Sequence, residues 1–353
     1  VKIATVAAAL SALGPDHRIP TTVTASADGR TVTLTGGGDP TLDPARLGRL
    51  AADTARALKA RGHTSVRLAY DTSLYEGPEL HPIGPNENLA PVTALMTSEG
   101  RLDKSDSGPA PRTADPAGDT ATAFAGLLTA AGVKITGAPA RTTDAPAEAT
   151  GTPAEATGTP AAAPKAPAPL ARTHSAPLAD LAERTLTHSD NDLAEALARQ
   201  TALAREQPAS FDGAGKAVRD ELAELGLPLA GARFADGSGL DRRDRVSAAL
   251  LTALLTRAAD PARPALRPVL TGLPVGGFTG TLAGRFDTAP ATAGAGLVRA
   301  KTGTLTGVNT LAGTVVTADG RLLAFAFLAG STLSPYEAQP ALDRLSAALA
   351  GQG

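Results

Sequence analysis

The chain has 353 residues, enough for two domains or one large, elaborated domain. Its hydrophobic fraction of 42% is ordinary for a globular protein, and no apolar run is long enough to span a membrane. A net charge of −2, without a Lys/Arg cluster, argues against nucleic-acid binding. The absence of cysteine excludes disulfides and thiolate chemistry, and the histidines never fall at metal-ligand spacing. We therefore expect no metal and no other cofactor.

Residues 1–14 carry apolar side chains at helical spacing and end at Gly14-Pro15, a helix stop, so they predict a helix. Lys2 lies in its first turn, where the helix macrodipole disfavours a positive charge. This indicates a role other than helix stability, although an exposed lysine remains an alternative. Because the first residue is not Met, we expect the sequence to begin inside an element. The tail of a signal peptide is the second interpretation, because Thr5 and Ser11 interrupt the apolar run.

Alternating residues at 21–35 predict two strands around a hairpin turn, followed by a glycine-rich loop that lacks the spacing of a nucleotide-binding motif. Further elements are expected as a helix at 44–61, a strand at 65–70, a helix at 120–133 and a short strand at 133–136. From about residue 142 to 169 the chain is rich in Ala, Pro and Thr and contains a direct seven-residue repeat. Such a segment has no apolar face, so we expect a disordered loop.

Four polar residues, 189–192, stand between two predicted helices at 178–188 and 193–203. Asp192 with Glu195 is a plausible capping box for the second helix. One cap needs one residue, so Ser189 and Asn191 are surplus to ordinary helix-start chemistry.

The C-terminal part of the chain predicts helices followed by a sheet and a closing helix. A helix is expected at 213–226, a turn at 236–240, helical runs at 246–258 and 264–271, a strand at 297–304, a hairpin at 308–329 and a helix at 337–350. This order makes α+β the expected fold class.

The strand at 297–304 contains Lys301, Thr302, Gly303 and Thr304. Glycine weakens a strand, but without a Cβ it allows an extended ligand backbone to lie close to the strand. Lys301 could then bind a carboxylate, with the two threonine hydroxyls as donors. Taken alone, these residues favour an edge strand with a bulge and a solvated lysine, because a tripeptide of common residues recurs by chance.

Lys2 near a helix start, Ser189 and Asn191 between helices, and Lys301-Thr302-Gly303 on a strand match the S-x-x-K, S-D-N and K-T-G motifs of penicillin-binding proteins and class A β-lactamases. If Lys2 is the lysine of S-x-x-K, the nucleophilic serine precedes it by three positions and lies two residues before Val1. Each motif alone is weak, but the set in this order is specific.

Beyond these motifs, the chain resembles the D-alanyl-D-alanine carboxypeptidase/endopeptidase family, the low-molecular-mass class C penicillin-binding proteins. The resemblance covers nearly the whole chain apart from the Pro/Ala/Thr-rich segment. It is carried by residues 1–24, 36–42, 98–101, 188–195, 236–240 and, above all, 299–311. It also accounts for the 186 residues between Lys2 and Ser189, because that family inserts domains there. The sequence departs from the family in having no tryptophan and in the region around residues 77–82.

The resemblance implies a β-lactamase/DD-peptidase-like core, an antiparallel sheet flanked by helices, with a large insertion. The catalytic core would comprise residues 1–20 and 170–353, and residues 21–141 would form the inserted domain or domains. The implied activity is serine-type D-Ala-D-Ala carboxypeptidase or endopeptidase hydrolysis of peptidoglycan stem peptides through an acyl-enzyme. β-Lactam antibiotics would be covalent inhibitors of the longer chain that carries the serine.

The resemblance also implies a role for each site residue. Lys2 would take the proton of the serine, Ser189 would pass it to the leaving amine, and Asn191 would hold the substrate amide and orient Lys2. Lys301, Thr302 and Thr304 would bind the terminal carboxylate beside Gly303, and the backbone N–H of Thr304 would contribute to the oxyanion hole. Contacts to the far end of the stem peptide would come from Leu240, Arg242 and Leu305.

Two other functions remain open from the sequence. A β-lactamase would share the acylation residues but needs a deacylating carboxylate that no motif nominates. A non-catalytic protein that binds stem peptides would lack the upstream serine. The implied location is extracytoplasmic, either secreted or associated with the cell wall or membrane. The sequence indicates no oligomeric state.

The repeat segment gives a direct test of the domain description. Because residues 142–169 have no apolar face, deletion of residues 146–159 should leave the thermal midpoint nearly unchanged. Differential scanning calorimetry of the two chains measures this, and a loss of several degrees would show that the segment packs.

Overall fold

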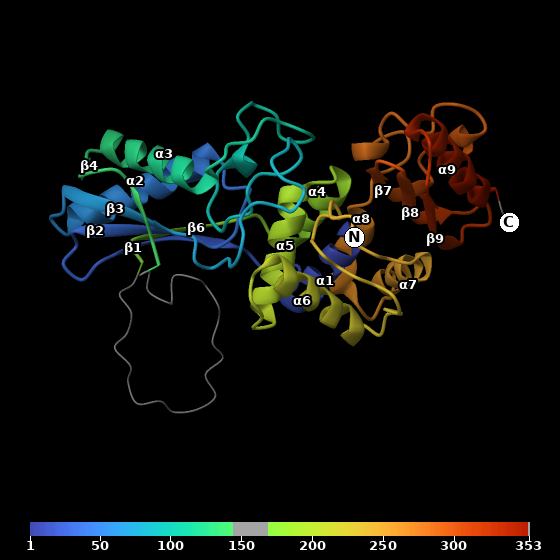
Figure 1. The fold of residues 1–353 in the computed structure, drawn as a ribbon, viewed down its shortest axis with the longest axis horizontal. Helices are drawn as coiled ribbons and strands as arrows, with labels where there is room; N and C mark the ends of the chain where they lie inside the picture. Colours follow the sequence, from blue (N-terminus) through green and yellow to red (C-terminus); the bar gives the residue numbers. More distant parts are fainter. Residues whose placement is uncertain (144–168, 352–353) are drawn as a thin grey trace. The chain divides into compact units, whose positions relative to one another are not determined.

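The computed structural model describes residues 1–143 and 169–351. The loop expected at residues 142–169 lies, apart from its end residues, outside the described residues. Residue contacts divide the chain into two compact units, one of residues Val1–His17 and Pro177–Gly353 and the other of residues Arg18–Ala176 (Figure 1). The independent folding of the expected domains stays a prediction. No helix within 1–143 and 169–351 is long and apolar enough to cross a membrane.

The first unit contains a layer of helices built around α1 (Lys2–Leu13). The others are α4 (Leu178–Thr187), α5 (Asn191–Ala204), α6 (Phe211–Glu224), α7 (Ala248–Ala258) and the short α8 (Pro268–Thr271). Residues 2–10 of α1 are all buried, because α4, α5, α6 and α7 each pack against it. A helix that is apolar on every side is typical of such a central position. Lys2 and Thr5 are therefore buried polar residues that need hydrogen-bond partners.

The sheet of this unit has the order β7-β8-β9, and both pairs of strands are antiparallel. Its strands are β7 (Val298–Leu305), β8 (Val308–Val316) and β9 (Leu322–Gly330). Helix α9 (Pro335–Ala350) packs on one face, where Val298 and Ala300 join the apolar core. Because side chains alternate along a strand, Lys301 lies on the opposite face, the one that carries the helical layer. The α+β class and the antiparallel sheet flanked by helices are confirmed.

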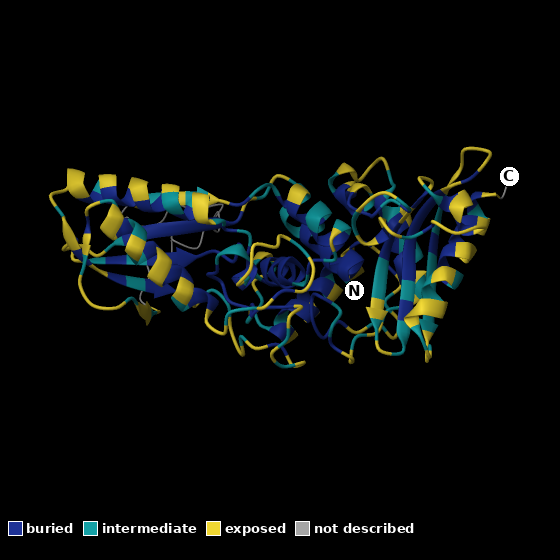
Figure 2. Cartoon of the chain, turned by 90° about the horizontal axis from the view of Figure 1, so that it is seen from above, coloured by how far each residue is buried: buried dark blue, intermediate teal, exposed yellow. Residues whose placement is uncertain are grey.

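The second unit is a mixed sheet covered by α2 (Pro44–Ala60) and α3 (Pro116–Ala130). Its strand order is β4-β3-β2-β1-β6, with β5 also paired to β3. The strands are β1 (Pro20–Ala25), β2 (Thr31–Gly36), β3 (Ser65–Asp71), β4 (Lys134–Ile135), β5 (Ala140–Thr142) and β6 (Ala171–His174). Strands β1, β2, β3 and β8 are mostly buried, and exposed residues gather on the outer faces of the helices (Figure 2).

Two details of this unit were not expected from the sequence. Helix α3 begins at Pro116, four residues before the expected start, because Asp115 caps it by accepting from the N–H of Gly118 at 2.9 Å. Strands β5 and β6 were not predicted, because segments of three and four residues show no readable alternation.

Candidate active site

The start of α5 separates the roles of the three residues Ser189, Asp190 and Asn191. Asp190 is the N-cap, and its Oδ1 accepts from the backbone N–H of Leu193 at 3.0 Å. The predicted capping box of Asp192 and Glu195 is therefore wrong, since the cap lies two residues earlier. Because Asp190 satisfies the helix end, Asn191 is left with its side chain available for another contact.

Ser189 precedes this cap with a left-handed backbone, φ +59°. A non-glycine residue in this region is uncommon and is held there by its surroundings. Its hydroxyl is half-buried and has no hydrogen-bond partner among the described residues. Ser189 thus presents an unused hydroxyl two residues before Asn191.

Lys2 meets Asn191 across the interface of α1 and α5. Its Nζ donates to Asn191 Oδ1 at 2.6 Å and to the backbone carbonyl of Ser238 at 2.7 Å. The side chain is only 8% exposed. Burial lowers the pKa of Lys2 from its ordinary value, and the charges of Asp236, Asp190, Glu195 and Asp192 oppose that shift.

The carbonyl that Lys2 contacts belongs to a tight turn built around the carboxylate of Asp236. The backbone N–H groups of Gly239, Leu240 and Asp241 donate to it at 2.6, 2.9 and 2.8 Å, and the hydroxyl of Ser238 donates at 2.9 Å. The turn expected at residues 236–240 is present, and Asp236 is the reason for its shape. A carboxylate with several backbone donors is rigidly held.

Two further contacts fasten this turn to the helical layer. The carboxylate of Glu195 on α5 accepts from the backbone N–H groups of Gly237 and Ser238, at 3.1 and 2.9 Å. The hydroxyl of Thr5 on α1 donates to the carbonyl of Gly237 at 2.7 Å. Sequence reasoning assigned no site role to Glu195 or Ser238, because the contacts of Glu195 with the turn and of Lys2 with Ser238 join residues 42 or more positions apart. Asp236 was recognised only as part of a turn, because its bonds to residues 238–241 are local.

Lys301 brings the third predicted motif to the same place. It is 6% exposed, and its Nζ donates to the carbonyl of Thr302 at 2.8 Å. Burial first, and then repulsion by Lys2, hold the pKa of Lys301 well below its ordinary value. The structure therefore brings Lys2, Asn191 and Lys301 together, with Ser189 beside Asn191.

The outer edge of β7 is open beyond Ala300. Before that point the edge is occupied, because Gly276 donates to the carbonyl of Val298 and Ala300 donates to that of Pro274. Backbone groups alternate in direction along an antiparallel strand, so those of Thr302 and Thr304 also point to this edge. Neither amide has a backbone partner among the described residues. The edge thus offers two free N–H donors next to Lys301.

The threonine side chains contact the elements beside β7. Thr302 Oγ1 lies 3.0 Å from Thr281 Oγ1, and the amide of Gln339 on α9 donates to Thr304 Oγ1 at 3.4 Å. Gly303 has a structural reason in addition to the predicted ligand approach. A Cβ there would lie 2.3 Å from the hydroxyl oxygen of Thr310 on β8.

The residues predicted to contact the far end of a substrate lie on two loops that touch. Leu240 is half-buried at the end of the Asp236 turn, and Arg242 is exposed. The guanidinium of Arg242 donates to the carbonyl of Thr306 at 2.8 Å, directly after the half-buried Leu305. These three residues therefore form one surface, continuous with the turn that holds Lys2.

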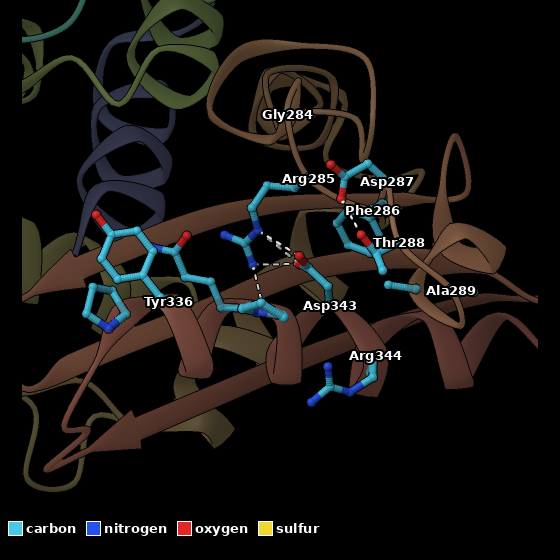
Figure 3. Close-up of a pocket in the computed structure, with 13 residues that line it drawn as sticks. Gly284, Arg285, Phe286, Asp287, Thr288, Ala289, Tyr336, Asp343 and Arg344 are labelled. Atoms are coloured by element: carbon cyan, nitrogen blue, oxygen red, sulfur yellow. Dashed lines mark hydrogen bonds and ion pairs between the residues drawn. The ribbon is translucent and has the colours of Figure 1, made fainter.

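A cavity of about 320 Å³ lies between the segment 284–291 and residues 335–344 of α9 (Figure 3). Arg285 and Asp343 form a buried ion pair against it, with Nε 2.8 Å from Oδ2. Tyr336 lies at one end, and Asp287 with Thr288 lies at the other. Considered within each unit separately, the described residues contain no cluster of three His, Asp or Glu side chains placed to share a metal ion.

Comparison with known proteins agrees with this geometry. The model of the D-Ala-D-Ala carboxypeptidase 3 (S13) family matches residues 1–131 and 108–349. The chain is 37% identical to "Carboxypeptidase DacB" of Mycolicibacterium smegmatis, over 100% of this chain and 74% of that protein. It is 35% identical to "Carboxypeptidase Rv3627c" of Mycobacterium tuberculosis, over 93% of this chain and 69% of that protein.

Among solved structures, penicillin binding protein 4 (dacB) of Haemophilus influenzae has the same fold. The TM-score is 0.75 at 21% sequence identity, covering 99% of this chain and 91% of the other. The suspected family and the serine-type carboxypeptidase class are thereby confirmed. The chain belongs to the D-Ala-D-Ala carboxypeptidase 3 (S13) family.

Proposed function

We propose that this protein hydrolyses the D-Ala–D-Ala bond of peptidoglycan stem peptides through a serine acyl-enzyme, and that β-lactams acylate the same serine. The observation that carries the proposal is the hydrogen bonding of Lys2. A neutral amine has two N–H groups and one lone pair. Asn191 and the Ser238 carbonyl take both N–H groups, so the lone pair is left to accept a proton.

Lys2 is the general base for a serine three positions before it, two residues before Val1. Residues three apart on a helix share a face, which places the serine hydroxyl at the lone pair of Lys2. The lowered pKa of Lys2 increases the neutral fraction that can act as a base. The serine oxygen then attacks the carbonyl of the penultimate D-alanine, and its proton moves to Lys2.

The open edge of β7 binds the substrate. An extended peptide pairs with this edge, and the N–H of Thr304 stabilises the developing oxyanion together with the N–H of the serine. Lys301 and Thr302 bind the terminal carboxylate. A carboxylate next to Lys301 raises its pKa again, so Lys301 becomes protonated when substrate arrives.

The hydroxyl of Ser189 relays the proton to the leaving D-alanine amine, supported by its lack of any other described partner. Water then hydrolyses the acyl-enzyme. Leu240, Arg242 and Leu305 contact the remote part of the stem peptide. Because the substrate is cell-wall material, the proposed location is extracytoplasmic.

The proposal predicts which form of the chain reacts with penicillin. The 353-residue chain should give no covalent adduct by intact-mass analysis, because Ser11 lies nine residues after Lys2, about 13 Å along a helix. The same chain extended upstream through the serine should give a stoichiometric adduct. Replacement of that serine by alanine is the matched control and should abolish the adduct. An adduct on Ser189, or on any other serine of the 353-residue chain, would contradict the assignment.

Lys301 gives a second test in the extended chain. Lys301→Ala should lower the acylation rate far more than the free energy of unfolding, because the lost charge acts on the ligand. Stopped-flow acylation and urea denaturation measure the two quantities. If the variant unfolds while its folded fraction reacts at the original rate, Lys301 is a structural residue.

A further inference from the structure

Helix α5 controls both hydrogen-bond acceptors of Lys2. Asn191 accepts through its own side chain at 2.6 Å. Glu195, one helical turn later, fixes the turn whose Ser238 carbonyl accepts at 2.7 Å. Residues four apart lie on the same face of a helix. A single helix face therefore determines where the ammonium or amine of Lys2 can sit.

The contact between Glu195 and the turn is fully buried. Glu195 is 0% exposed, and its Oε1 accepts from Gly237 N–H at 3.1 Å and from Ser238 N–H at 2.9 Å. Its Oε2 lies 3.2 Å from the same Gly237 nitrogen. Burying a carboxylate is unfavourable unless its oxygens accept hydrogen bonds, and the two turn amides are donors that Glu195 needs.

We propose that Glu195 is a positioning residue, which holds the Ser238 carbonyl against Lys2 Nζ and so directs the lone pair of Lys2 at the serine. This inference rests on the proposed function, because Lys2 must be the base. Asp236 shapes the turn internally, whereas Glu195 fastens the turn to α5. Thr5 supports the same placement through the carbonyl of Gly237.

The chemistry of the contact explains why position 195 carries a glutamate and not a glutamine. Both amides of the turn donate to Oε1, and the Gly237 N–H also donates to Oε2 at 3.2 Å, so a carboxamide NH2 in the place of Oε2 would face an N–H donor. Glu195 also places a negative charge near Lys2, as do Asp236, Asp190 and Asp192. Lys301 on the facing strand is the neighbouring amine, and burial and Lys2 lower its pKa as well. Position and charge are thus two separable contributions of one side chain.

Two variants in the extended chain separate these contributions. Glu195→Gln removes the charge and faces an N–H with a donor, whereas Glu195→Asp keeps the charge but shortens the reach. Both should lower the acylation rate at saturating penicillin by about 10²-fold, the usual effect of a misplaced catalytic group. The apparent dissociation constant of the preceding complex should not change, because Lys301 and Thr302 are intact.

The pH profile distinguishes the two variants. Acylation needs neutral Lys2, so its acid limb follows the pKa of Lys2. Loss of a negative neighbour lowers that pKa, so Glu195→Gln should shift the limb to lower pH, and Glu195→Asp should leave it in place. If both variants keep the acylation rate and the acid limb of the unsubstituted chain, the proposal is overturned.

Glu221→Gln is the matched control, because Glu221 is 5% exposed on α6 and pairs with Arg205 at 2.6 Å, away from the turn. It should leave the acylation rate of folded protein unchanged; equal losses of rate in this control would overturn the proposal.

Hydrogen exchange of the Gly237 and Ser238 amides tests the same contact without measuring catalysis. Faster exchange in Glu195→Gln alone supports the role, and unchanged exchange overturns it. Absence of any adduct on the unsubstituted extended chain would instead refute the proposed function.

Discussion

Two lysine amines buried close to one another are the constraint on which this site depends. Burial lowers the pKa of both amines, although nearby carboxylates oppose the shift at Lys2, and repulsion by Lys2 lowers the pKa of Lys301 further. The surrounding structure holds both side chains in place. Lys2 is fixed by the packing of α1 among other helices. Lys301 is fixed by strand β7, which pairs with β8 in a sheet that carries helices on both faces. The site therefore exists only where the helical layer meets the sheet.

Within that constraint, different elements have different tasks. Helix α1 supplies Lys2, the base in the proposed mechanism, and the start of α5 supplies Asn191 and the hydroxyl of Ser189. The turn around Asp236 supplies a backbone carbonyl, which, unlike a side chain, cannot swing away. Strand β7 supplies Lys301 and an unpaired edge. Burial, and next the charge of Asp236, raises the pKa of the neighbouring Asp244 to about 8.

The sequence predicted the parts of this site that are local. Lys2, Ser189, Asn191 and Lys301 were found because short motifs on recognisable helices and strands carry them. The contacts of Glu195 were not found, because a hydrogen bond between residues 42 positions apart leaves no periodic pattern. The turn around Asp236 was predicted, but its attachment to α5 was not. The same limit explains the capping error at Asp192, since Asp190 and Asp192 are equally good caps until the chain direction before α5 is known. Strands β5 and β6 were not predicted only because they are three and four residues long.

The pKa values of Lys2 and Lys301 test the central claim most directly. The chain has seven lysines, so ¹³C labelling at Cε should resolve them individually by NMR. Titration should give two lysines, assigned by Lys2→Arg and Lys301→Arg, with pKa values clearly below the ordinary value of about 10.4 for an exposed lysine. If Lys2 and Lys301 titrate with the surface lysines, the two amines are not buried together and the account of the site is wrong.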